Sequence, residues 1–158
     1  NNIQSKLPEE WGLLIIGRDD GIGEQLSRLV HEYGLAENIR FLGSRDDVPQ
    51  CLGAADCGIL TSHTEGFSNA ILEYMASGLP VVTTDVGDVS EMIQSGQDGF
   101  IAPVNDFGML CKQVILLSKQ PDLRVKFSIN SRKKAMTKYS VSALLKNTIA
   151  VYNEAIGA

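Results

Sequence analysis

Short apolar runs that end near a glycine or a turn residue recur along the chain. Five such runs cover residues 13–16, 39–42, 57–61, 80–84 and 99–102. A short, continuous apolar run is typical of a strand that is buried on both faces of a sheet. The pattern therefore predicts five strands of this kind, with the run at 80–84 rich in β-branched residues.

Between and after these runs, apolar residues recur every three or four positions, as on one face of a helix. The predicted helices cover 22–33, a short stretch from about 46 to 55, 68–77, 87–95, and most of the chain from Phe107 onward. Ser140 can cap the last helix, whose apolar positions are expected to face the core. Strands that alternate with helices predict an α/β fold with a doubly wound, mostly parallel, Rossmann-like sheet.

In such sheets ligands bind outside the carboxyl ends of the strands. Three loops that follow strands are therefore expected to carry the function, at residues 17–23, 43–47 and 62–69.

Composition limits the classes of protein that remain. The 158 residues are expected to form a single domain, and 44% hydrophobic with 21% charged residues excludes general disorder. A net charge of −5 argues against a broad nucleic-acid-binding surface. No apolar stretch approaches the roughly 20 residues that span a bilayer, and no secretion signal opens the chain. Three cysteines without CxxC spacing predict reduced thiols in a cytoplasmic protein, and no metal-ligand spacing is present.

The loop at 62–69 joins a predicted strand to a predicted helix. Small or polar residues at Gly66, Ser68 and Asn69, together with Phe67, lie where the helix has unpaired backbone N–H groups. A helix start also carries about half a positive charge, so this loop is a candidate phosphate site.

Two carboxylates flank that candidate site. Glu65 precedes the helix, and Glu73 lies about one turn inside it, roughly 6 Å along the axis from Asn69. Carboxylates accept hydrogen bonds from the neighbouring hydroxyls of a sugar, which favours sugar recognition. The spacing alone is equally compatible with two solvated helix charges.

The whole motif resembles the donor-binding half of retaining glycosyltransferases of the GT-B family 4, the group 1 glycosyl transferases. Glu65 and Glu73 match the E-x7-E element of that family, followed by a match over residues 74–82 and at Val86-Gly87. Further landmarks of the family match at 15–17, 41–43, 55–56 and 99–100. The resemblance covers residues from about 13 to 152.

The resemblance implies a role for each matching position. Glu65 is the candidate catalytic residue and would bind hydroxyls of the transferred sugar, while Glu73 would bind the ribose. Backbone N–H groups around Phe67, Ser68 and Asn69 would hold the donor phosphates. The nucleobase would lie beside two segments, Gly17-Arg18 and Gly43 to Val48. No cofactor or metal is implied, because the nucleotide-diphosphate sugar is itself the donor substrate.

The chain also departs from the family pattern. Members of the family have an Arg and a Lys early in this domain that bind the diphosphate, and this chain has no match to them. It also has no match to the first strand of the domain, expected at the centre of the sheet, or to the N-terminal, acceptor-binding domain. We therefore expect residues 1–158 to be one nucleotide-sugar-binding domain of a larger two-domain enzyme, inactive alone. The acceptor is expected to be a glycan or a lipid, bound by the absent domain.

Several alternatives remain open. Arg18 either contacts the donor base or phosphate, or pairs with Asp19 or Asp20. His63 either contacts substrate or is an incidental loop residue. The cluster Arg132-Lys133-Lys134 is a solvated helix end or a peripheral contact with the inner face of a membrane. The rival functions are a sugar-nucleotide epimerase of the same fold and a non-catalytic module that retains the fold.

Overall fold

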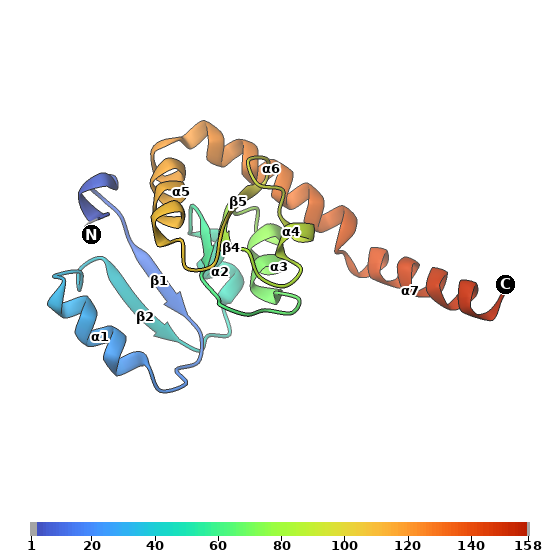
Figure 1. The fold of residues 1–158 in the computed structure, drawn as a ribbon, viewed down its shortest axis with the longest axis horizontal. Coiled ribbons are helices and arrows are strands. Elements are labelled where there is room, and N and C mark those ends of the chain that lie inside the picture. Colours follow the sequence, from blue (N-terminus) through green and yellow to red (C-terminus); the bar gives the residue numbers. More distant parts are fainter. Residues whose placement is uncertain (1–2, 158) are drawn as a thin grey trace. The chain divides into compact units, whose positions relative to one another are not determined.

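The computed structural model describes residues 3–157, which form an α/β structure divided into two compact units (Figure 1). The first unit extends to Cys51 and the second begins at Leu52. In the first unit, a short 3-10 helix η1 (Gln4–Lys6) precedes β1 (Leu13–Ile16), α1 (Gly23–Glu32) and β2 (Ile39–Gly43). Helix α2 (Val48–Gly53) spans the boundary in the sequence.

The second unit alternates strands and helices and then ends in three consecutive helices. Its elements are β3 (Gly58–Leu60), α3 (Asn69–Ala76), β4 (Val81–Thr84), α4 (Val89–Met92), β5 (Gly99–Ala102), α5 (Phe107–Lys119), α6 (Pro121–Lys138) and α7 (Val141–Ile156). Pro121 stands at the first position of α6, where its missing N–H costs no hydrogen bond.

All strand pairs are parallel, and the α/β class predicted from the sequence is confirmed. The strands form two sheets: β1 pairs with β2, and β4 lies between β3 and β5. In the second sheet Gly58 pairs with Val81, and Val81 pairs with Gly99. All five predicted strands are present.

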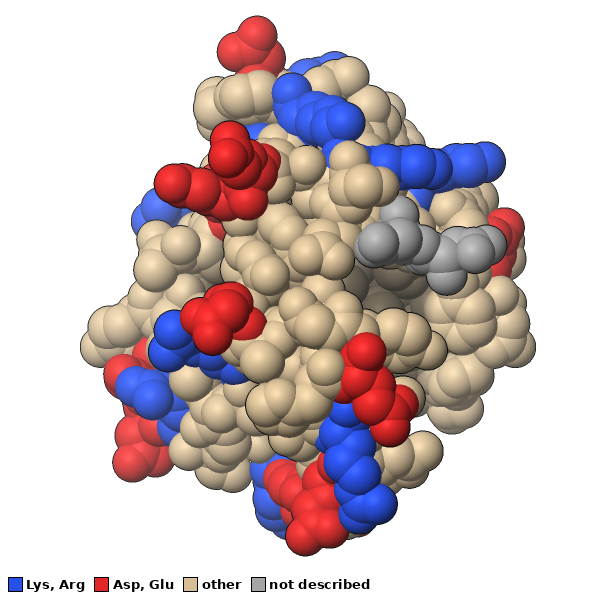
Figure 2. All heavy atoms as spheres, turned by 90° about the vertical axis from the view of Figure 1, so that its left-hand side faces the viewer, with Lys and Arg blue, Asp and Glu red and all other residues tan. Residues whose placement is uncertain are grey.

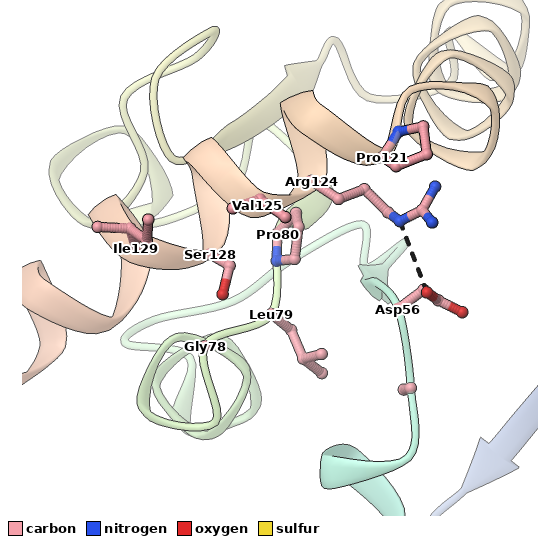
Figure 3. Close-up of a pocket in the computed structure, with 10 residues that line it drawn as sticks. Asp56, Gly78, Leu79, Pro80, Pro121, Arg124, Val125, Ser128 and Ile129 are labelled. Carbon is pink, nitrogen blue, oxygen red and sulfur yellow. Dashed lines mark ion pairs between the residues drawn. The ribbon is translucent and has the colours of Figure 1, made fainter.

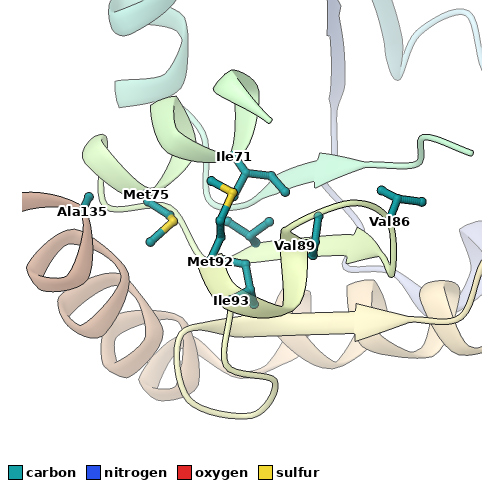
Figure 4. Close-up of a cluster of buried hydrophobic side chains, with 8 residues drawn as sticks. Ile71, Met75, Val86, Val89, Met92, Ile93 and Ala135 are labelled. Atoms are coloured by element: carbon teal, nitrogen blue, oxygen red, sulfur yellow. The ribbon is translucent and has the colours of Figure 1, made fainter. Parts of the chain in front are cut away.

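Strand β4 is buried along its whole length because helices cover both faces of its sheet. Val81 packs into one cluster with Ile71 and Met75 of α3 and Met92 of α4 (Figure 4). Val82 points to the opposite face, as neighbouring strand residues do, and packs with Leu117 and Phe127. The rings of Phe100 and Phe127 meet edge to face there, with centroids 5.1 Å apart.

Some predicted core positions lie at the surface instead. The expectation that the run at 13–16 is buried on both faces is wrong, because Leu14 is 46% exposed and Ile15 is also exposed. The apolar side chains of α7 are likewise exposed, including Leu144, Ile149 and Tyr152, although Ser140 caps the helix as expected. An apolar pattern shows which positions of a helix or strand could be buried. Whether they are buried also depends on another element packing against them.

The helix predicted over 87–95 is shorter in the structure. Helix α4 ends at Met92, and Ile93 adopts an extended backbone. The next residue is held by Asp98, whose carboxylate accepts a hydrogen bond from the Gln94 N–H at 2.6 Å and pairs with Lys134 at 3.0 Å. This buried contact replaces the further helical turn.

Candidate functional site

The loop between β3 and α3 lies at the carboxyl end of β3, where the sequence predicted a ligand site. Ser68 is the N-cap of α3, and its hydroxyl accepts a hydrogen bond from the Ile71 N–H at 3.4 Å. Its side chain is buried, so the cap fixes the point at which the helix begins.

The cap leaves two donors of this helix start unpaired. Within residues 3–157, no hydrogen bond is formed to the backbone N–H of Asn69 or of Ala70. Asn69 is exposed and Ala70 half-buried. Unpaired N–H groups at the positive end of a helix attract an anion such as a phosphate.

The two glutamates of the motif differ in their surroundings. Glu65 is half-buried, and its Oε1 accepts a hydrogen bond from the Ser62 hydroxyl at 2.7 Å. Glu73 is exposed on α3, while Ile71 and Met75 of the same helix are fully buried. The pKa of Tyr74 is raised, first because the side chain is buried and second because of the charge of Glu73. Because Glu73 is exposed, it is free to meet a ligand, whereas Glu65 is already oriented by a protein group.

The end of β4 and the loop that follows it support the loop that carries Glu65. The hydroxyl of Thr84 donates to the backbone oxygen of Ser62 at 2.6 Å, and the Asp88 N–H donates to that of Gly66 at 3.2 Å. Gly87 lies so close that a Cβ atom there would clash with the backbone oxygen of Gly66. The backbone around Glu65 is thus held from the neighbouring strand.

Two further residues of the predicted site lie on this loop. The ring of Phe67 is about half exposed and packs against Tyr139 at the end of α6, with ring centroids 6.0 Å apart. His63 is exposed. Phe67 therefore has a structural partner in Tyr139, whereas the role of His63 stays a prediction.

The segment of the chain that contains this loop carries only negative charges. Residues 46–111 contain no Lys or Arg and ten Asp or Glu residues. A diphosphate bound at the start of α3 would gain from backbone dipoles, and its cationic partners would have to come from outside this segment.

The other predicted site residues belong to the first unit. There the Gly17 N–H donates to the Gly43 oxygen at 3.0 Å, so the ends of β1 and β2 lie side by side. Arg18 pairs with Asp20 at 2.7 Å, which is the structural alternative predicted for it. Val48 is the first residue of α2. The predicted site residues are therefore divided between the two units.

The start of α1 differs from that of α3 because a protein carboxylate already occupies it. Oδ1 of Asp19 accepts hydrogen bonds from the N–H groups of Gly21, Ile22 and Gly23 at 2.8, 3.1 and 3.0 Å. These bonds lower the pKa of Asp19, the bond from Gly21 most of all. A ligand anion at this helix start would lie beside a protein carboxylate.

A cavity of about 320 Å³ lies at the opposite end of α3 (Figure 3). Leu79 and Pro80, just before β4, line it together with Asp56 and Arg124, whose ion pair measures 3.5 Å. Arg124 also donates to the oxygens of Leu117 and Ser118 at the end of α5. Because this cavity is at the amino ends of the strands and its charges are paired, we do not assign it the ligand.

Other chemistries find little support in residues 3–157. No helix in this range has the length and hydropathy that crossing a bilayer requires. The same residues contain no group of three His, Cys, Asp or Glu side chains able to hold a metal ion. Burial raises the pKa of Cys57 to about 12, which makes it a poor nucleophile at neutral pH. In the view of Figure 2, basic and acidic side chains lie beside one another in several places.

Sequence reasoning placed Ser62 in the loop at 62–69 without giving it a role, and it did not assign Thr84 or Gly87 to the site. Gly87 had a signal, since it belongs to one of the matching landmarks at 86–87. Thr84 had none, because its contact with Ser62 joins residues 22 positions apart.

A capped helix start with free N–H groups, flanked in the sequence by two carboxylates, is suited to bind an anion next to hydroxyl groups. The family model "Glycosyl transferases group 1" matches residues 1–120, and this chain belongs to that family. The α/β fold is that of GT-B glycosyltransferases, as predicted from the sequence.

Individual relatives agree with this assignment. The chain is 30% identical over 150 residues to the lipopolysaccharide core biosynthesis mannosyltransferase LpsB of Rhizobium meliloti, covering 90% of this chain and 42% of LpsB. It is 28% identical over 129 residues to N-acetyl-alpha-D-glucosaminyl L-malate synthase of Bacillus anthracis, covering 82% and 34%. The structure of Anabaena HepE in complex with UDP superposes with a TM-score of 0.88 at 22% identity, covering 96% and 43%. The chain thus spans less than half the length of these relatives.

Proposed function

We propose that this chain is the donor-binding domain of a larger, retaining glycosyltransferase of family 4. The intact enzyme transfers a sugar from a nucleotide-diphosphate sugar to a glycan or lipid acceptor. The observation that carries the proposal is the start of α3, where the unpaired N–H groups of Asn69 and Ala70 lie between Glu65 and Glu73 in the sequence. Family membership and the likeness to HepE, which was solved with UDP and with UDP-glucose, support a nucleotide sugar as the ligand.

In this proposal each part of the site has a separate task. The N–H groups and the helix dipole hold the diphosphate and stabilise the charge that develops when it leaves. Glu73 accepts hydrogen bonds from the ribose, and Glu65 accepts them from the transferred sugar. The predicted place of Gly17, Arg18 and Gly43 beside the nucleobase concerns the first unit and stays a prediction.

The lack of Lys and Arg between residues 46 and 111 adds a requirement. A diphosphate carries more negative charge than two N–H groups offset, so cationic side chains from elsewhere in the enzyme must complete the site. The acceptor-binding residues belong to the part of the enzyme outside this chain.

Calorimetric titration with UDP, GDP and ADP tests the proposal and identifies the base. For the nucleotide that binds, Glu73→Ala is expected to weaken affinity by more than about tenfold, because a charged hydrogen-bond acceptor is lost. Glu32→Ala, at the exposed end of α1, is the control and should leave affinity unchanged. Equal affinities for wild type and Glu73→Ala would contradict the ribose-binding role.

A further inference from the structure

The Glu65 carboxylate is held by a neutral group instead of a cation. Its hydrogen bond from the Ser62 hydroxyl, 2.7 Å long, is the one side-chain hydrogen bond that Glu65 makes within residues 3–157. A single bond to Oε1 fixes the carboxylate and leaves Oε2 to accept from a ligand. Because Ser62 brings no charge, it orients the carboxylate without neutralising it.

Ser62 is itself fixed to the sheet. Its backbone oxygen accepts a hydrogen bond from the Thr84 hydroxyl at 2.6 Å, and Thr84 is only 5% exposed at the carboxyl end of β4. Two hydrogen bonds in series therefore link the rigid central strand to Glu65: Thr84 donates to Ser62, and Ser62 donates to Glu65.

The far side of the loop is held as well. The Asp88 N–H donates to the Gly66 oxygen, and Gly87 contacts the backbone of Glu65 and Gly66 too closely to allow a side chain. With the backbone restrained on both sides, the remaining freedom of Glu65 is rotation of its own side chain. The Ser62 hydroxyl removes that freedom.

We infer that Ser62 is a positioning residue that sets the direction of the Glu65 carboxylate, with Thr84 anchoring Ser62. The inference rests on the proposed function, in which Glu65 binds the transferred sugar. It implies that the Ser62 hydroxyl matters for the sugar part of the donor and not for the nucleotide part. A residue that merely stabilised the loop would affect both parts equally.

The test compares affinities for a nucleotide sugar and for its nucleoside diphosphate by calorimetry. The wild type is first screened with three pairs of ligands: UDP-glucose with UDP, GDP-mannose with GDP, and ADP-glucose with ADP. The pair that binds best is then used for the variants. Ser62→Ala is expected to lower the affinity for the nucleotide sugar roughly tenfold. Its affinity for the nucleoside diphosphate should stay within about twofold of the wild-type value. Ser62→Thr keeps a hydroxyl and should restore most of the affinity. Ser90→Ala, at an exposed position of α4, is the control.

A double-mutant cycle with Glu65→Ala then tests whether Ser62 acts through Glu65, because alanine, unlike glutamine, cannot accept the hydrogen bond from Ser62. In the Glu65→Ala background, Ser62→Ala should cause no further loss of affinity for the nucleotide sugar. Equal losses of affinity for both ligands in Ser62→Ala, or additive losses in the double variant, would overturn the inference. So would a loss in Glu65→Ala without one in Ser62→Ala. If neither ligand of any pair binds the wild type, or if Glu65→Ala has no effect, the proposed function itself fails.

Discussion

Gly87 is the residue at which an added Cβ atom would disturb the candidate site most directly. It has a positive φ of +51° and lies against the backbone oxygens of Glu65 and Gly66. Glycine is required there for two reasons, since a side chain would meet both an unfavourable backbone conformation and a steric clash. Gly96 shares only the first constraint, because its φ is +82° and a Cβ atom there would meet no other atom within 4 Å.

These two glycines give a matched pair of substitutions. Gly87→Ala is expected to lower the free energy of unfolding by more than about 2 kcal/mol, because the backbone of the Glu65 loop must shift. Gly96→Ala should lower it by only about 1 kcal/mol, the cost of the left-handed conformation. Urea denaturation followed by circular dichroism measures both values. Similar losses for the two variants would show that the close contact at Gly87 is unimportant.

At the scale of elements, helices α1 and α3 both follow a strand but begin differently. Asp19 accepts hydrogen bonds from the N–H groups of Gly21, Ile22 and Gly23, so a negative charge of the protein already lies at the start of α1. The neutral residue Ser68 caps α3, and two N–H groups there remain without a protein partner among the described residues. Of these two helix starts, that of α3 has no protein carboxylate bound to its N–H groups, which favours an anionic ligand there.

The hydrogen bonds that Asp19 accepts make a prediction about pH. The folded-state pKa of Asp19 lies below the ordinary value of 3.8, so its stabilising effect is fully present above that value. The effect is lost as the pH falls through the lowered folded-state pKa. In an NMR titration the amide signals of Gly21 and Gly23 should shift with this protonation, and Asp19→Asn should abolish the transition. An unchanged transition in Asp19→Asn would refute this role of Asp19.

At the scale of the whole molecule, the two units differ in how much they bury. No described residue of the first unit, 3–51, is fully buried. The second unit contains two buried clusters on opposite faces of β4. Hydrophobic burial is the main source of stability, so the second unit should be the more stable of the two.

Native-state hydrogen exchange tests this difference. Amides of β4 are expected to exchange only through global unfolding, whereas those of β1 and β2 should have protection factors at least about 30-fold lower. Val81→Ala in β4, which removes fully buried methyl groups, should accelerate exchange in β4 much more than in β1. Equal protection of β1 and β4 would mean that the two units unfold together.

The sequence by itself determined the elements and the position of the site along the chain. The strands at 13–16, 81–84 and 99–102 follow from apolar runs, because the backbone geometry of a strand repeats within a few residues. The start of α3 at Asn69 follows from the polar residues that cap it. The spacing of Glu65 and Glu73 likewise put one carboxylate before that helix and one inside it, as the structure has them.

Only the tertiary structure decided which apolar positions are buried and what holds the site. The runs at 13–16 and 81–84 look alike in the sequence, yet Leu14 is exposed and Val82 is buried, because helices cover both faces of β4. The bond from Thr84 to Ser62 and the close approach of Gly87 to Gly66 depend on β3 pairing with β4. Such contacts join residues about twenty positions apart, and no local periodicity reaches that far.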